Sequence, residues 1–294
     1  MTTNGIRPID TSDEEISERF CPYPRRMDDL LRITPGSTVD LSAIDTRSTP
    51  GFDGGKHDAK APFEALQERL ADLQDLLYAD GSQRLLLVLQ AMDTGGKDGT
   101  IRHVLDRVNP IGVHVRAFKK PTETDLARDY LWRVHAQVPA DGELVVFNRS
   151  HYEDVLVVRV HGHVDDGAAR QRFGHIRDFE RMLVEEGTTV VKVFLHISKE
   201  EQAERLQARL DEPDKNWKFS SADIAERAHW DRYQQVYEEA IAATSTEHAP
   251  WYVVPADRKW YRNLAVATIL VRTLEGLPMS YPPAEEGLAD VVID

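Results

Sequence analysis

The segment 85–100 constrains the fold more than any other part of the chain. An unbroken apolar run, Leu85 to Leu89, leads through Gln-Ala-Met-Asp-Thr-Gly-Gly into Lys97 and a helical stretch. Such a short apolar run is typical of a strand buried on both faces of a parallel sheet. Gly95 and Gly96 let the backbone turn so that amides point inward, and the helix start adds free N–H groups and a positive dipole end. The segment therefore predicts a phosphate-binding loop in which Lys97 supplies a positive charge.

This loop departs from the usual pattern G-x-x-x-x-G-K-[ST] at two positions. Ala91 stands where the first glycine belongs, and Asp98 stands where a hydroxyl would hold magnesium. A surface turn that merely contains Gly-Gly-Lys is the alternative, but the strand before it and the helix after it favour phosphate binding. A divalent metal would need another ligand, and Asp93 is the nearest candidate. The predicted phosphate-binding residues are Gly95, Gly96, Asp98, Gly99 and Thr100, together with Lys97.

Apolar strands and helical segments alternate along most of the chain. The expected strands are 84–90, 113–118, 143–148, 188–197 and 251–255. The expected helices are 62–81, 98–108, 123–137, 151–160, 168–186, 199–210, 221–243 and 258–275. This alternation predicts one α/β domain with a five-stranded parallel sheet covered by helices on both faces.

The ends of the chain differ in composition from this domain. Residues 1–60 are expected to form an irregular arm with a short helix, residues 61–282 the domain, and residues 283–294 an acidic tail. Residues 211–220 break the helical pattern between two helices, which predicts a lid near 205–222.

A second buried strand runs into polar residues at Phe147-Asn-Arg-Ser-His-Tyr-Glu-Asp154. Ligands of open α/β sheets sit at the carboxyl ends of strands, so Asn148, Arg149, Glu153 and Asp154 are expected near the loop. A carboxylate there can hold magnesium, and Arg149 can neutralise a phosphoryl group. The alternative is a helix start that carries acids because its dipole favours them.

The net charge of −14 argues against a protein that coats nucleic acid or an anionic membrane. Residues 91–120 nevertheless carry six Lys or Arg against three acids, so the predicted site is locally basic. Cys21 is the only cysteine, which excludes an intramolecular disulfide. The start of the chain does not resemble a secretory signal, and no apolar run is long enough to cross a bilayer. We therefore expect a cytoplasmic protein.

Three motifs together resemble the second polyphosphate kinase family: Ala91-Met-Asp-Thr-Gly-Gly-Lys-Asp-Gly99, Phe147-Asn-Arg-Ser-His-Tyr-Glu-Asp154 and Trp217-Lys-Phe-Ser220. The resemblance covers roughly residues 40–282. It implies a three-layer P-loop kinase-like fold with a helical lid, and Mg²⁺-dependent, reversible transfer of the terminal phosphoryl group of polyphosphate to AMP or ADP. Asn148 followed by Glu153-Asp154 is similar to the subclass that uses both acceptors.

The resemblance also assigns roles by position. Asp93 and Asp154, assisted by Glu153, would organise Mg²⁺, or Mn²⁺ in its place. Lys97 would hold the phosphate chain, and Arg149 and Arg133 would contact phosphates at the transfer point. The lid would contribute Arg209, Lys215 and Lys218. The implied partners are polyphosphate, AMP, ADP and ATP, without nucleic acid or membrane, and a homo-oligomer, a tetramer or a dimer, is expected.

Other functions fit parts of the same pattern. An ATP-dependent nucleoside monophosphate kinase would need a similar loop and lid, and a non-catalytic nucleotide-binding module would need the loop alone. A phosphohistidine mechanism, a metal pair at His161 and His163, and a nucleobase stacked on Trp217 are further alternatives.

Overall fold

The computed structural model describes residues 27–287, 291 and 293, and its centre is a five-stranded sheet. The strands are β1 (Arg84–Ala91), β2 (Val113–Ala117), β3 (Leu144–Asn148), β4 (Thr188–His196) and β5 (Trp251–Pro255). All four strand pairings are parallel, in the order β2-β3-β1-β4-β5. Each strand lies within one residue of the range expected from the sequence, and the five-stranded parallel sheet is confirmed.

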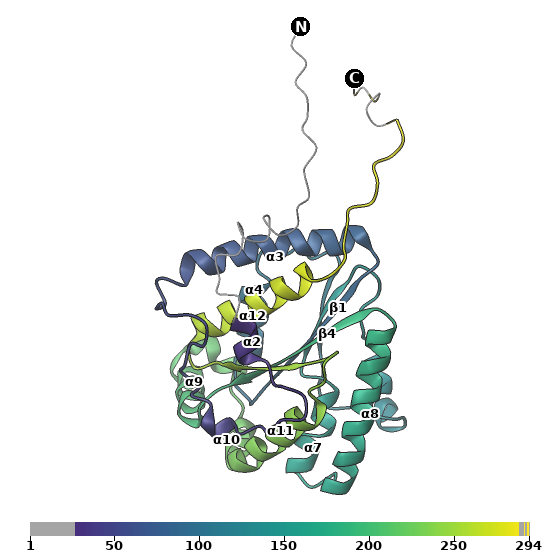
Figure 1. Cartoon of the computed structure of the whole chain (residues 1–294). Coiled ribbons are helices and arrows are strands. Elements are labelled where there is room, and N and C mark those ends of the chain that lie inside the picture. Colours follow the sequence, from purple (N-terminus) through teal and green to yellow (C-terminus); the bar gives the residue numbers. More distant parts are fainter. Residues whose placement is uncertain (1–26, 288–290, 292, 294) are drawn as a thin grey trace.

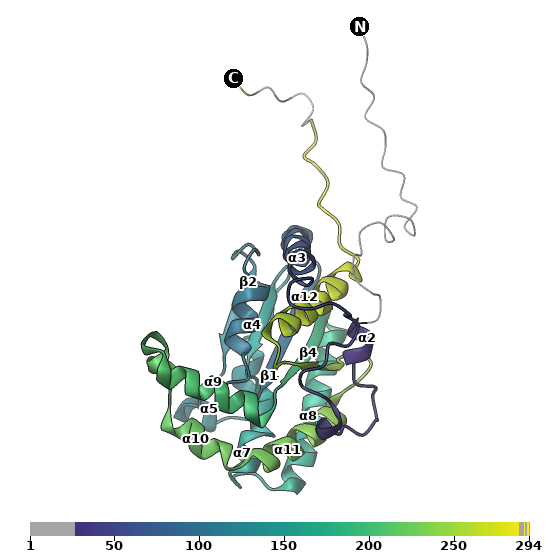
Figure 2. The same cartoon turned by 90° about the vertical axis from the view of Figure 1, so that its left-hand side faces the viewer.

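Long helices cover both faces of this sheet (Figures 1 and 2). One face carries α3 (Lys60–Asp80), α4 (Lys97–Val104) and α12 (Lys259–Glu275), and the other carries α8 (Asp166–Glu185) and α11 (Trp230–Thr244). Gly81 ends α3 in the left-handed conformation, at φ 65°, as expected of a glycine at a helix C-terminus. The three-layer α/β fold is therefore confirmed.

Three of the expected helices are divided. Residues 123–137 form only α5 (Glu123–Leu126) and α6 (Trp132–His135), because the Asp129 carboxylate accepts from the Leu131 amide and competes with the helix. Residues 151–160 form a 3₁₀ turn, η2 (His151–Asp154), and then α7 (Val157–Val160). Residues 221–243 form α10 (Ser221–Arg227), which is separated from α11. The helix α9 (Lys199–Asp211) and the 3₁₀ segment η3 (Pro213–Lys218) precede α10.

The described part of the expected arm, residues 27–59, packs on the domain. It contains α2 (Met27–Leu31) and η1 (Leu41–Ala43), and Met27, Leu31 and Leu41 are buried in the core. Arg32 forms an isolated antiparallel bridge with Tyr252 of β5. This stretch therefore covers the β5 edge, whereas residues 1–26, with Cys21, lie outside the described part.

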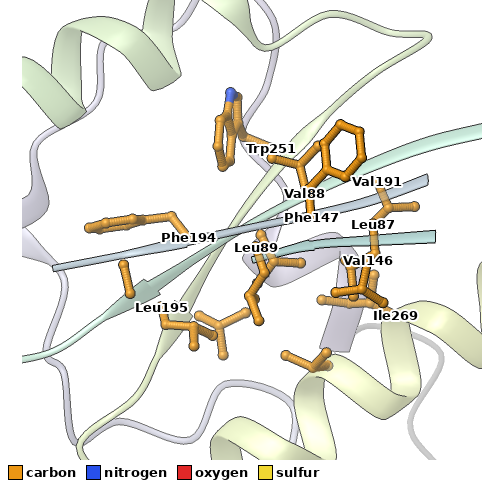
Figure 3. Packing of buried hydrophobic residues seen from close by; sticks show 14 of the residues in the cluster. Leu87, Val88, Leu89, Val146, Phe147, Val191, Phe194, Leu195, Trp251 and Ile269 are labelled. Atoms are coloured by element: carbon orange, nitrogen blue, oxygen red, sulfur yellow. The ribbon is translucent and has the colours of Figure 1, made fainter. Parts of the chain in front are cut away.

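The core consists of β-branched, leucine and aromatic side chains from the strands and from the helices that cover them, such as Trp251 of β5 and Ile269 of α12 (Figure 3). Leu87 of β1, Phe147 of β3 and Phe194 of β4 are among its buried members. Because these strands are buried on both faces, their carboxyl ends are held rigidly side by side. No helix in the described residues is long and apolar enough to span a membrane.

Candidate active site

In the turn between β1 and α4, the backbone has positive φ angles and leaves little space for a Cβ atom, so residues other than glycine are strained there. Gly96 has φ 101°, and a Cβ atom on Gly95 would lie 2.6 Å from the Ala91 Cβ atom. Thr94, a β-branched residue, has φ 64°, in the left-handed region. The turn therefore packs tightly against the end of β1 and leads directly into α4, in the order of strand, turn and helix that the sequence predicted.

Lys97, the first residue of α4, is 9% exposed. Its Nζ donates to the Ala91 carbonyl oxygen at 3.1 Å, and no carboxylate of the described residues lies within ion-pair distance. Burial lowers the pKa of Lys97, and the neighbouring Arg149 lowers it further. The ammonium group is thus a desolvated, incompletely compensated charge, which an arriving phosphate would neutralise.

Arg149 and two acids form an ion cluster beside the loop. The Arg149 Nη2 atom lies 2.7 Å from Asp93 Oδ1, and its Nη1 atom lies 3.7 Å from Glu153 Oε2. Burial opposes the charge on Arg149, but Glu153 and Asp93 hold its pKa above the ordinary value. Arg149 also has φ 64°, a second non-glycine residue in a sparsely populated conformation. β3 lies beside β1 in the sheet, so the structure brings Asp93, Lys97, Arg149 and Glu153 together.

These residues lie at one side of a cavity of about 870 Å³. Nine cations and three carboxylates line this cavity. The cations are Lys97, Lys119, Lys120, Arg149, Arg205, Arg209, Lys215, Lys218 and Lys259, and the acids are Asp93, Asp98 and Asp223. Gly95, Gly96, Gly99 and Asn148 also line it, and the Asn148 Nδ2 donates to Asp98 Oδ1 at 2.7 Å. Thr100 lies beneath the loop, with its hydroxyl bonded to the Gly96 carbonyl. The local basic character expected from the sequence is therefore a property of the cavity.

Three of the cations around the loop were not identified from the sequence. Arg205 of α9 donates to the carbonyl oxygens of Thr94 and Gly95 at 3.3 and 3.0 Å, and Lys259 of α12 lines the cavity. Arg262 is 3% exposed, and its Nη1 atom would lie 2.1 Å from a Cβ on Gly96. Burial and the nearby Arg205 lower the pKa of Arg262 to about 10. The spacing of Arg205 and Arg209 on one helix face is the one sequence signal that could have shown this second layer of charge.

Asp154 and Arg133 lie away from the loop carboxylates. The Asp154 carboxylate faces Arg133 at 3.8 Å, and neither residue lines the cavity. Arg133 also donates to the Lys119 carbonyl oxygen at 2.8 Å. Burial raises the pKa of Asp154, and Arg133 partly opposes this. In the described structure the two residues therefore support the segment that carries Lys119 and Lys120.

The segment from α9 to α10 closes one side of the cavity. Arg209 donates to Asp223 Oδ2 at 3.0 Å and to the Lys218 carbonyl oxygen at 3.1 Å, which ties η3 to α10. Lys215 pairs with Glu212, and Lys218 lies over the ring of Trp217. Trp217 is 78% exposed. All three predicted cations of the lid thus reach the cavity, and an aromatic ring lies beside them.

A second charged group is buried beneath η2. Lys192 of β4 donates to Glu180 Oε2 at 2.6 Å, to the Thr244 carbonyl oxygen at 2.7 Å and to the Tyr152 hydroxyl at 3.2 Å. Glu180 also accepts from Tyr152 and His151, at 2.9 and 3.3 Å. Although burial acts in the opposite direction, Lys192 holds the pKa of Glu180 below its ordinary value. This network fixes the turn that carries Glu153.

The histidines lie away from the cavity, whose described lining contains none. The His161 Nε2 pairs with Glu226 at 2.9 Å, and the rings of His161 and His163 are 6.2 Å apart. The described residues contain no group of three or more His, Cys, Asp or Glu arranged to hold a metal. This arrangement gives no support to a phosphohistidine or a histidine metal pair.

Fold and site together define an α/β protein of the P-loop kinase class. The lysine of its loop lies beside arginines and carboxylates at the carboxyl ends of β1 and β3.

Comparison with known proteins gives the family. The sequence model described as "Polyphosphate kinase 2 (PPK2)" matches residues 54–280, and the chain belongs to this family. An AMP/ADP-polyphosphate phosphotransferase of Meiothermus ruber is 58% identical over 263 residues, which are 90% of this chain and 98% of the relative. An ADP-polyphosphate phosphotransferase of Rhodopseudomonas palustris is 45% identical, covering 86% of this chain and 91% of the relative.

A solved structure agrees with this assignment. The crystal structure of polyphosphate kinase 2 from Arthrobacter aurescens TC1 superimposes with a TM-score of 0.88 at 48% identity. The match covers 92% of this chain and 96% of that one.

Proposed function

We propose that the protein transfers the terminal phosphoryl group of polyphosphate to AMP and ADP. The observation that carries this proposal is the 870 Å³ cavity, whose nine cations surround the phosphate loop from both sides. Polyphosphate has more phosphates than a nucleoside triphosphate, so it can form charge-assisted hydrogen bonds with more of these cations. The relatives named as AMP/ADP- or ADP-polyphosphate phosphotransferases support the same donor.

To catalyse this transfer, the protein has to position the two substrates and neutralise the charge of their phosphates. Lys97 and Arg149 neutralise the transferring group, and the loop amides bind its oxygens. Lys119 and Lys120, on one side of the cavity, and Arg209, Lys215 and Lys218, on the other, hold the two substrates. The attacking phosphate oxygen of the acceptor is already ionised near neutral pH, so no general base is required.

Magnesium fits the donor set at Asp93. Asp93 Oδ1 is bonded to Arg149, and Oδ2 has no hydrogen-bond partner in the described structure, while the residue lines the cavity. Magnesium in phosphoryl-transfer sites is held by one or two carboxylates together with water and substrate phosphates. Asp93 would hold it, whereas Asp154 would act through Arg133. The bound ion would neutralise charge on the phosphates.

A homo-oligomer in the cytoplasm is the setting that we propose for this activity. The expectation rests on the resemblance to the family and on the single cysteine of the chain.

The test is an assay that omits ATP. The protein is incubated with polyphosphate, Mg²⁺ and AMP, and the products are separated by chromatography. We expect ADP and then ATP. A parallel reaction with ATP and AMP but no polyphosphate tests the ordinary nucleoside monophosphate kinase. Folded protein that forms ADP only in the second reaction would overturn the proposal.

A further inference from the structure

A second cavity, of about 530 Å³, lies between α3, α12 and the segment before α3. Its described lining shares no residue with the cavity at the phosphate loop. Lys259 lines the loop cavity, whereas its neighbour Trp260 lines this one, so the first turn of α12 separates them. The volume is in the range of cavities that hold small organic ligands.

Aromatic rings form the walls of this second cavity. Phe63 and Trp260 line it, and neither is fully buried. Phe52 packs edge-on against the ring of Trp260, with centroids 5.8 Å apart, which fixes the orientation of the indole. Two aromatic walls favour a planar ligand over a purely ionic one.

Asn263 offers a hydrogen-bond donor in this cavity. The residue is 7% exposed and is part of the lining. Its Oδ1 accepts from Arg262 Nε and Nη2, at 3.1 and 2.8 Å. A guanidinium group can only donate, so the Asn263 side-chain atom that faces Arg262 must be the oxygen Oδ1. The Nδ2 atom therefore points away from Arg262. Nδ2 has no partner among the described residues, which leaves a donor that a ligand would satisfy.

The rim of the cavity is positive. Lys56, His57 and Lys60 line it, and the described lining contains no carboxylate. Two acids lie just outside the lining: Asp58 is 3.9 Å from the His57 Nδ1 atom, and Glu64 is 3.9 Å from the Lys60 Nζ atom. The 21-residue helix α3 begins here without a side-chain cap and without an acid in its first turn. The positive dipole end of the helix adds to the charge of the lysines. Few backbone donors are left there, because Pro62 has no N–H and the Lys60 amide donates to the His57 carbonyl oxygen at 3.2 Å. The rim therefore favours an anionic group.

We propose that this cavity is a second nucleotide site, separate from the site of phosphoryl transfer. The base lies between Phe63 and Trp260 with an acceptor atom on the Asn263 amide. The phosphates lie at Lys56 and Lys60 and at the start of α3. This assignment does not rest on the transfer activity, since binding needs neither a donor nor a metal.

The test counts nucleotides bound per chain. ADP binding to the full chain is measured by equilibrium dialysis with EDTA, so that no transfer occurs. The test variant is Lys56→Glu/Lys60→Glu, which changes two exposed lysines and leaves the walls intact. Arg170→Glu, an exposed charge reversal on α8, is the matched control. We expect the wild type and the control to bind one more ADP per chain than the double variant.

Competition identifies the ligand chemistry. Adenosine is expected to displace the additional ADP, because the base and ribose alone occupy the aromatic part of the cavity. Equal numbers of bound ADP in the wild type and the double variant would overturn the proposal. It would also be overturned if tripolyphosphate, and not adenosine, displaced the additional ADP, because the cavity would then extend the polyphosphate path. Transfer to AMP, measured with Mg²⁺ on the same preparations, is expected to be unchanged in the double variant, so a failure of the proposed activity is seen separately.

Discussion

Two buried lysines of this protein serve opposite purposes. Lys192 is fully buried, with three hydrogen bonds, one of which is the ion pair to Glu180. Lys97 is almost as buried, but it has one bond to a carbonyl oxygen and lines a cavity. The first charge is compensated by the fold itself, and the second is left for a ligand. Burial alone thus does not separate a structural cation from a binding one, whereas the number of partners does.

The largest expected effect on stability is at the compensated lysine. Lys192→Met leaves Glu180 buried without its cation, so the free energy of unfolding should fall by about 3–5 kcal/mol. Urea unfolding followed by circular dichroism measures the change. Lys192→Met/Glu180→Gln is the control, because glutamine removes the stranded charge and still accepts from Tyr152 and His151. It should recover most of the loss. If Lys192→Met is as stable as the wild type, Lys192 is not a structural cation.

The second prediction concerns the uncompensated lysine. Lys97→Ala should lower the rate of transfer from polyphosphate about 10²–10³-fold, since a desolvated charge at the transferring group is lost. Its free energy of unfolding should change by no more than about 1 kcal/mol, because only one hydrogen bond is removed. Steady-state rates and urea unfolding measure the two effects.

A matched variant on the same cavity is Lys120→Ala. Lys120 is exposed, so its loss should lower the rate about fivefold or less. A rate for Lys97→Ala equal to that of the wild type would show that the loop does not hold the phosphoryl group.

The smallest effect expected is on the pH dependence. Burial lowers the pKa of Lys97 below its ordinary 10.5. The charge that we propose binds phosphate is therefore present at lower pH and lost as the pH rises through the lowered value. The KM for polyphosphate should therefore rise with pH before 10.5 is reached. Lys97→Arg keeps its charge in this range and should show no such rise. The same rise in both proteins would assign the titration to another group.

The strands were predictable because their signal is local. An unbroken apolar run such as 85–89 has few alternatives, and its turn residues Gly95 and Gly96 follow at once. The helix expected over 123–137 was divided because a single side chain, Asp129, offers the backbone another partner. That bond joins residues two apart, so it is a local turn signal, but the apolar spacing does not register it.

The site was predictable where its residues follow the carboxyl ends of neighbouring strands. Asp93, Lys97, Arg149 and Glu153 meet for this reason. Arg205 and Arg262 reach the loop from α9 and α12, and only the packing of these helices brings them there. Lys192 carried a signal that went unused, namely one lysine within the apolar run Val190 to Phe194. An ammonium group in a strand buried on both faces requires a buried partner.

The backbone of the loop has a consequence for anyone who engineers this enzyme for heat resistance. Thr94 and Arg149 hold left-handed conformations that glycine adopts without strain, and such strain costs about 1–3 kcal/mol per residue. A search for stabilising replacements by backbone conformation would select these two positions early. At Arg149 the replacement would also remove a charge that we propose binds phosphate, so added thermal tolerance there would be obtained at the expense of turnover.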